Sequence, residues 1–301
     1  MRALVVLLAL LASVFMALGI VIRQRATMEV PPEHGVSTTM FTTLLRNPLW
    51  WAGTGVAVAG YVCQALALTH GSLIIVQPLL VSSLLFALPI SARLAHRRVT
   101  PSEWAWALLL TVGLAVFVLL ARPHAGDYRA AAPAWALVSV IVVPVVVVCV
   151  VIGARSTGRL RAGLLAAAVG VLFGVVAVLT KITMQRLAAE GVWSVLAVPA
   201  PYLLVVVGVA TTLLQQSALH AGVLKMSVPT MLVLEPMVAV LLGVVVLGED
   251  LTVTGFASAA LPIALAAMAA ATVALGRDEG ALEEQLQATV AGRSESPSRH
   301  H

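Results

Sequence analysis

Nine long apolar stretches, separated by short polar segments, constrain this chain more than any other feature. They cover roughly residues 4–22, 49–69, 72–92, 103–121, 133–153, 162–182, 200–219, 224–247 and 254–275. Each is close to the length of about 20 residues that an α-helix needs to cross the hydrocarbon core of a bilayer. Lipid offers no water to bond free backbone groups, so such stretches form helices. The chain is therefore predicted to be all-α, a polytopic membrane helical bundle of about nine spans.

The composition agrees with a protein that lies mostly in lipid. Only 10% of the 301 residues are charged, against roughly 25% in soluble domains, and the mean hydropathy is +1.03. The formal net charge of +5 comes from short basic clusters between the apolar stretches, where lipid headgroups would meet them. We therefore expect the lipid bilayer as a partner and no nucleic acid.

The beginning of the chain and two polar segments leave alternatives open. The first apolar stretch is similar to a secretory signal peptide, but it ends in basic residues and has a counterpart later in the chain, so we expect a retained span. Residues 36–45 are either an interfacial segment or a re-entrant helix, and they make a tenth span if they cross the membrane. Residues 191–198 hold the equivalent place in the second half.

Two halves of the chain share a sequence pattern at a constant offset. The first half contains QALALTHGSLIIVQP and the second contains QQSALHAGVLKMSVP, which aligns Gln64 with Gln215 and Pro78 with Pro229. Counterpart spans are five spans apart, and an odd number reverses direction, so the sequence predicts two inverted four-helix repeats. The predicted units are residues 1–125 (first repeat), 126–160 (linking span), 161–276 (second repeat) and 277–301 (polar tail).

The basic residues are distributed unevenly between the two sides of the predicted bundle. Most of the 18 Lys and Arg residues fall on the side that carries the loops after the first, third and fifth spans. The positive-inside rule places that side in the cytoplasm. We therefore expect a multi-pass protein of the plasma membrane with an outer N-terminus and a cytoplasmic polar tail.

A resemblance to the NIPA-type magnesium transporters of the drug/metabolite transporter superfamily is carried by two segments, RNPLWWAGTGVAVAGYVCQALALTHGSLIIVQPLLVSS and ASVFMALGIVIRQRA. A third segment, LVLEPMVAVLLGVVVLGEDLT, is similar to the EamA-type members. The resemblance covers residues 5–275 and implies a secondary transporter that moves Mg²⁺ or another cation. Tyr61 and Gln64 stand where the NIPA pattern has an acidic residue and an asparagine. A small organic metabolite or drug is therefore the alternative substrate.

Polar residues within the apolar stretches are the candidates for a transport pathway. Glu235 lies near the middle of a span, and ionisable groups in lipid usually face a cavity or a partner. It is a candidate cation or proton site and, because Mg²⁺ prefers oxygen ligands, the candidate metal ligand; a structural, hydrogen-bonded glutamate is the alternative. Four glutamines are candidates to line the pathway or to join helices by hydrogen bonds. They are Gln64, Gln77, Gln215 and Gln216.

Prolines and one lysine complete the set of candidate residues. Pro78, Pro229 and Pro236 are predicted to break the helical hydrogen bonding, either exposing carbonyl groups to a cavity or kinking the helices. Lys181 ends the sixth span and is expected to extend to the lipid headgroups. Its alternative partners are an anionic substrate and Glu235.

The remaining patterns exclude some functions and leave others open. The loop after the eighth stretch carries Glu249 and Asp250, which we expect in solvent at the outer surface. The sequence contains no H-E-x-x-H, G-x-S-x-G or Walker A motif, so we expect neither an enzyme nor a cofactor. A secondary transporter is the favoured function, and a non-transporting membrane protein is the alternative. The oligomeric state is open, a homodimer being one option.

Overall fold

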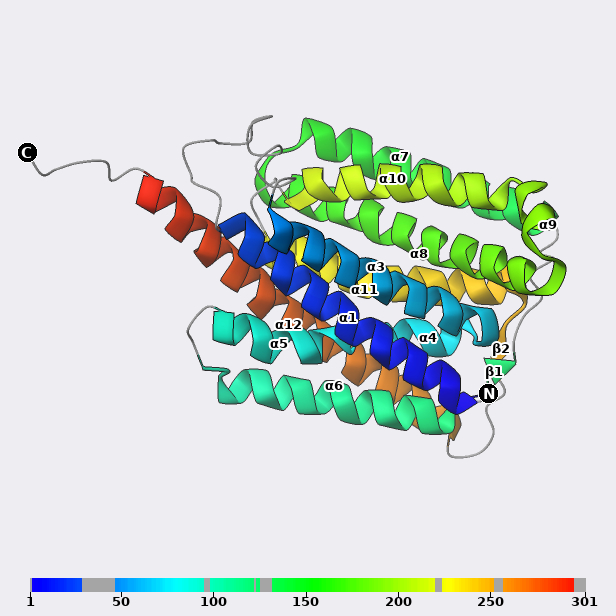
Figure 1. Ribbon diagram of the computed structural model, residues 1–301, viewed down its shortest axis with the longest axis horizontal. Helices are drawn as coiled ribbons and strands as arrows, with labels where there is room; N and C mark the ends of the chain where they lie inside the picture. The colour runs from blue at the N-terminus through cyan, green and yellow to red at the C-terminus, as the bar shows by residue number, and fades with distance from the viewer. Residues whose placement is uncertain are drawn as a thin grey trace, which may run out of the picture.

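The predicted helical membrane bundle is confirmed by the structure, a computed structural model (Figure 1). The structure describes residues 2–28, 47–94, 98–121, 123–124, 132–219, 224–251 and 257–294. Residues 36–45, whose insertion was left open, lie outside the described residues. Within the described part, eight helices are long and apolar enough to cross a membrane, and a shorter apolar helix covers Ala200–Gln215. Each of the nine predicted stretches therefore corresponds to helical structure.

The helices of the first half follow the predicted spans closely. They are α1 (Arg2–Met28), α3 (Pro48–His70), α4 (Leu73–Leu80), α5 (Ser83–Leu94) and α6 (Pro101–Leu120). Helix α6 begins with a capping box, in which the Thr100 side chain accepts from the backbone N–H of Glu103 and the Glu103 carboxylate accepts from that of Thr100.

The second half contains two helices that differ from the predicted boundaries. Its helices are α7 (Ala132–Arg155), α8 (Gly158–Glu190), α9 (Val192–Leu196), α10 (Ala200–Leu219), α11 (Leu224–Leu247) and α12 (Ala257–Ser294). Helix α8 extends beyond the predicted span at both ends. Helix α12 runs without interruption from the last span into the polar tail, so residue 276 is not a structural boundary.

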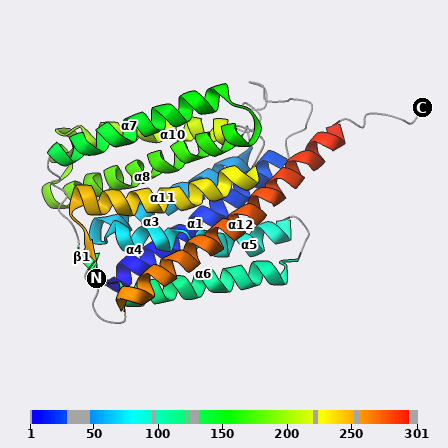
Figure 2. The same cartoon turned by 180° about the vertical axis from the view of Figure 1, so that it is seen from behind.

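Counterpart helices of the two halves run in opposite directions. In Figures 1 and 2, α1 runs against α8, α3 against α10, α4 and α5 against α11, and α6 against α12. Contacts within each half are extensive, with α1 packed on α3 and α8 packed on α10 and α11. Counterparts also meet each other, because α6 packs on α12 and α4 packs on α11. This arrangement is what an inverted repeat predicts.

Small residues bring α1 and α3 into close contact. A Cβ atom built on Gly19 would lie 2.9 Å from the backbone nitrogen of Ala57, and one on Gly60 would lie 3.2 Å from the carbonyl oxygen of Ala12. Membrane helices associate without a hydrophobic driving force between them, so van der Waals packing at such close contacts stabilises the pair.

One end of the bundle gathers the chain's N-terminus and several turns. The Arg2 guanidinium donates to the carbonyl oxygen of Ala121 at 2.6 Å, which joins the start of α1 to the end of α6. The short strands β1 (Pro123–His124) and β2 (Asp250–Leu251) pair antiparallel, with Pro123 opposite Leu251. The loops after α6 and α11 therefore meet at this end.

The third predicted span is two helices rather than one. Pro78 has no backbone N–H to continue the hydrogen bonding of α4, and α4 ends two residues later at Leu80. At the break, the Ser82 hydroxyl donates to the carbonyl of Leu79 at 2.6 Å, and its oxygen lies 3.0 Å from the Ser13 hydroxyl oxygen of α1. The Leu79 carbonyl at the end of α4 thus accepts from both the backbone N–H and the hydroxyl of Ser82.

The other two candidate prolines do not end a helix. Pro229 and Pro236 lie inside α11, which continues through both. The prediction of a helix break is therefore wrong for this pair. Each still removes one backbone donor from the helix interior.

Candidate functional site

A buried carboxylate cluster joins the two halves of the bundle at one end. It consists of the Glu249 carboxylate, the Lys181 ammonium and the backbone N–H groups of Leu73 and Ile74. Oε1 of Glu249 accepts from Leu73 at 3.0 Å, and Oε2 accepts from Ile74 at 3.2 Å. Lys181 donates to Oε1 and forms an ion pair with Glu249. We call this group the Glu249 cluster.

The end of α11 directs Glu249 back into the protein. Gly248 adopts a left-handed conformation with φ +63°, and its N–H bonds the Val244 carbonyl at 3.2 Å. This is the glycine cap that commonly ends helices. The N–H of Glu249 then donates to the Gly243 carbonyl at 3.1 Å. A Cβ on Gly243 would lie 3.0 Å from Oε2 of Glu249, so this glycine leaves room for the carboxylate.

Helix α4 begins inside the protein, and Glu249 caps it. The N–H groups of Ile75 and Val76 bond the carbonyl of Ser72, so Glu249 supplies the acceptors that Leu73 and Ile74 lack. A helix N-terminus carries a partial positive charge that favours an anion. Ser72 holds the N-cap position, but its side chain makes no capping hydrogen bond. A carboxylate from a distant part of the chain thus takes the role that the local serine usually has.

The position of Lys181 corrects two expectations from the sequence. Its side chain is 0% exposed and its partner is Glu249, also 0% exposed. The expectation that Lys181 extends to the headgroups is therefore wrong, and so is the placement of Glu249 in solvent. Lys181 is not paired with Glu235, which lies about 18 Å from the end of α11 along the helix at 1.5 Å per residue. Asp250, next to Glu249, is exposed as expected.

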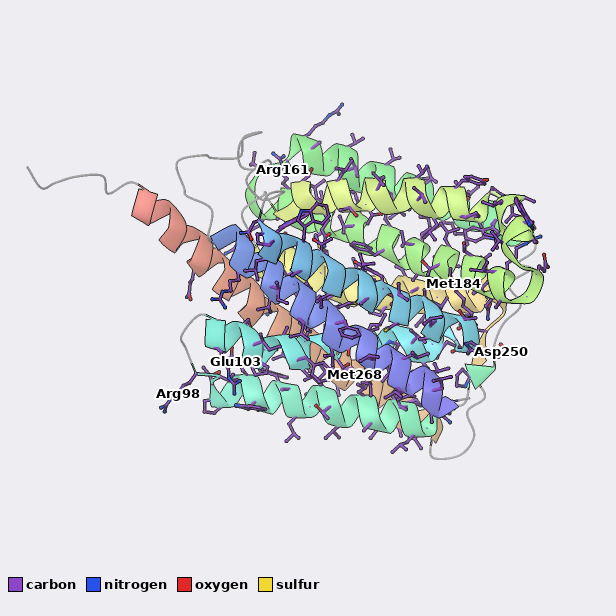
Figure 3. The ribbon with its side chains drawn as sticks, viewed as in Figure 1. Arg98, Glu103, Arg161, Met184, Asp250 and Met268 are labelled. Carbon is purple, nitrogen blue, oxygen red and sulfur yellow. The ribbon has the colours of Figure 1, made fainter. Side chains whose placement is uncertain are left out.

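The cluster lies at the same end of the bundle as the paired strands. Figure 3 labels Met184, three residues after Lys181 on α8, and Asp250, next to Glu249, and both lie toward that end. Three elements from different parts of the sequence therefore meet here: the start of α4, the later part of α8 and the residue after α11.

Unpartnered polar atoms belong to residues close to the cluster in the sequence. Within the described residues, three buried side-chain atoms have no hydrogen-bond partner: Oγ of Ser72, Nε2 of Gln77 and Oε1 of Gln185. Ser72 and Gln77 flank the first turn of α4, and Gln185 lies one helical turn after Lys181. Buried polar groups are normally satisfied, so each such atom needs an explanation.

The other predicted polar residues are spread over the bundle. Gln64 is buried on α3, Gln215 is half-buried on α10, and Glu235 is half-buried near the middle of α11. The side chain of Gln216 lies outside the described residues. Of the six candidate pathway residues, the structure therefore places Lys181 in the Glu249 cluster and Gln77 on the helix that the cluster caps. In the part of the chain that the structure describes, no three His, Cys, Asp or Glu side chains form a group that could hold a metal ion.

An apolar groove lies between α11 and α12, with α4 at its floor. Its volume is about 680 Å³, and its lining is almost entirely apolar. Figure 2 shows α11 and α12 diverging on this face of the bundle. The lining includes Pro78 of α4 and its C-cap residue Val81, Val240 and Val244 of α11, and Met268 of α12. We call this cavity the α11–α12 groove.

The long apolar helices define a polytopic helical membrane protein. A protein of Corynebacterium glutamicum that is described as uncharacterized is 35% identical to this chain over 274 residues. The alignment covers 91% of this chain and 95% of the relative, so the chain belongs to the same protein family as that corynebacterial protein. No family model matches the chain, and no solved structure matches it.

Proposed function

We propose that this protein is a secondary transporter of the drug/metabolite transporter type, built from two inverted repeats. The observation that carries the proposal is the Glu249 cluster. It bonds a residue of the second half to the first turn of α4 in the first half. Transporters with inverted repeats alternate access by moving one unit against the other. A buried polar contact between the units at one end is what closes that end.

The α11–α12 groove favours a small organic solute with an apolar part as the substrate. Ligand sites for small molecules usually measure about 300–1,000 Å³ and are lined mainly by apolar side chains. The groove, at about 680 Å³, has this size and this lining. Residues of both halves line it, since Pro78 belongs to α4 and Val240 to α11. A site shared by the two units is accessible to either side as they move.

A cation such as Mg²⁺ is the second candidate substrate. It is favoured by Glu235, an acidic residue near the middle of α11, together with the resemblance to NIPA-type transporters. An acidic residue at that depth is costly in lipid and usually has a functional partner. In this reading Glu235 contacts the cation during transport.

The proposed location is the plasma membrane, with the C-terminus of the chain in the cytoplasm. Arg98 and Arg161, both exposed, lie toward one end of the bundle, and Asp250 lies toward the other (Figure 3). The end of α7 at Arg155 and the start of α8 add further basic residues to the first of these ends. The positive-inside rule assigns that end to the cytoplasm.

Proteoliposomes test both the transport activity and the substrate class. We expect uptake of a small organic solute, and we expect Val240→Trp to abolish it because the indole fills the groove. Val205→Trp is the matched control, since Val205 of α10 is 64% exposed on the outer surface of the bundle. Mg²⁺ uptake that Glu235→Gln impairs and Val240→Trp leaves intact would favour the second candidate instead. The absence of both fluxes would reject the transporter proposal.

A further inference from the structure

The donors of the Glu249 cluster form a complete site for a carboxylate, which the protein's own Glu249 fills. Oε1 of Glu249 accepts hydrogen bonds from the Leu73 N–H and the Lys181 ammonium, and Oε2 accepts one from the Ile74 N–H. Two backbone donors at a helix N-terminus and one buried cation are the groups that bind anionic substrates in transporters with broken helices. Helix α4 is such a half-helix, since it ends at Leu80 and α5 continues the span.

Two further donors at α4 have no acceptor. The hydroxyl of Ser72 and the amide nitrogen of Gln77 make no hydrogen bond to any described residue, although Ser72 is 5% exposed and Gln77 is 1% exposed. Ser72 immediately precedes the two N–H groups that hold the carboxylate. A buried donor left without a partner loses the hydrogen bonds that it makes in water. Glu249 alone therefore does not use every donor that the start of α4 offers.

Residues of the cluster and residues that line the α11–α12 groove are neighbours in the sequence on two helices. On α4, Gln77 is followed by Pro78, which lines the groove. On α11, Gly243 lies against the Glu249 carboxylate, and the next residue, Val244, lines the groove. At a rise of 1.5 Å per residue, Pro78 and the C-cap residue Val81 lie about 7.5 and 12 Å from Leu73 along the helix axis. The polar donors thus lie one to two helical turns along α4 from residues that line the apolar groove.

We infer that the start of α4 and Lys181 form a binding site for an organic monocarboxylate, which Glu249 occupies in this conformation. The substrate's carboxylate replaces that of Glu249 when the two halves separate at this end, and its apolar part lies in the α11–α12 groove. This inference rests on the proposed transport function and names its substrate class. The charge of the site supports this inference, because the substrate's carboxylate replaces the carboxylate of Glu249 and the site keeps the same net charge.

Ligand-dependent thermal stability of the purified full chain tests the inference without measuring transport. In Glu249→Ala, the donors are free, and we expect hexanoate to raise the melting temperature with saturable concentration dependence. Hexanoate should bind at least tenfold more tightly than acetate, because its additional methylene groups are buried in the groove. Hexanol and inorganic phosphate should have little effect. Wild-type protein should respond at least tenfold more weakly than the variant, since its own Glu249 competes.

Two double variants separate the site from a general effect of fatty acids. Lys181→Met combined with Glu249→Ala should lose the hexanoate response, whereas Arg186→Met combined with Glu249→Ala should keep it, because Arg186 pairs with Glu190 elsewhere on α8. Val240→Trp combined with Glu249→Ala should weaken the response to hexanoate and leave the response to acetate unchanged.

The inference is overturned if hexanol stabilises Glu249→Ala as much as hexanoate does, or if the response survives the loss of Lys181. Should Glu249→Ala not fold, Glu249→Gln retains the shape of the side chain and undergoes the same measurement. Absence of a hexanoate response in the folded variant also rejects the site. Because the assay measures binding, its failure is distinct from a failure to observe transport in proteoliposomes.

Discussion

Lys181 and Glu249 form an ion pair that no solvent reaches. Burial removes both charges from water, and the loss of hydration is offset only if geometry and further hydrogen bonds are favourable. Here Glu249 also accepts from two backbone N–H groups, whereas the Lys181 ammonium bonds the Glu249 carboxylate. The pair therefore depends on both partners, and the loss of either leaves a buried charge.

Removal of the lysine alone should strongly destabilise the protein. Lys181→Met leaves the Glu249 carboxylate buried without its cation, and breaking a buried pair in this way costs about 3–5 kcal/mol. We expect a clearly lower melting temperature in detergent. Arg186→Met, which breaks the partly exposed pair with Glu190, should change it little, since such pairs contribute about 0–1 kcal/mol.

The double variant Lys181→Met, Glu249→Gln checks the cause. If an uncompensated charge destabilises the single variant, neutralising Glu249 should restore part of the lost stability. Equal stability of wild type and Lys181→Met would contradict the assignment of a structural ion pair.

At the scale of elements, close helix packing and broken helices coexist in the same half of the molecule. Helices α1 and α3 meet at Gly19 and Gly60, where the backbones approach closely. Next to them, α4 ends after Pro78, and the Ser82 hydroxyl bridges the break to α1. The rigid pair thus supports a short helix whose N-terminus carries the Glu249 cluster.

Gly19→Ala should destabilise the α1–α3 pair. The new methyl group would lie 2.9 Å from the Ala57 nitrogen and 3.0 Å from its Cα, and backbone atoms cannot rotate away as side chains do. We expect a fall in melting temperature. Gly55→Ala on α3 is the matched control, because nothing lies within 4 Å of its new Cβ. It should be neutral or stabilising by up to about 1 kcal/mol through helix propensity. A similar loss in both variants would argue against the close contact.

Apolar length and periodicity predict helices well, but they do not predict tertiary partners. The nine stretches could be located because each has close to the 20 residues that span the hydrocarbon core and carries few charges. A helix break was predicted at Pro78, Pro229 and Pro236 alike, but α4 ends after Pro78 whereas α11 continues through the other two. The capping of α4 by Glu249 could not be predicted, because 176 residues separate Leu73 from Glu249. The glycine before Glu249 was the one local signal, as it marks a helix end.

On the scale of the whole molecule, the two ends of the bundle differ in chemistry. One end carries exposed arginines such as Arg98 and Arg161, and the other carries Asp250 and the buried Glu249 cluster. The opposite directions of counterpart helices place related loops at opposite ends (Figures 1 and 2). This charge difference is the basis of the membrane orientation that we propose.

Cysteine labelling in intact cells tests this orientation. The two native cysteines, Cys63 and Cys149, are free and are first replaced by serine. A membrane-impermeant thiol reagent should then modify Asp250→Cys in intact cells. It should modify Arg98→Cys and Arg161→Cys only after the cells are permeabilised. The reverse pattern would invert the assigned topology, and labelling of all three in intact cells would contradict it.

The Glu249 cluster also sets an order of events during biosynthesis. Glu249 follows Lys181 by 68 residues, which corresponds to roughly 3–14 s of translation at 5–20 residues per second. During that interval the lysine and the start of α4 have been synthesised while their acceptor has not. A chain truncated before residue 249 keeps a cation and two N–H groups without the carboxylate that satisfies them, at a cost of several kcal/mol in a lipid environment. The cluster can therefore form only after α11 has been completed, when Glu249 reaches Lys181 and the start of α4 in the first half.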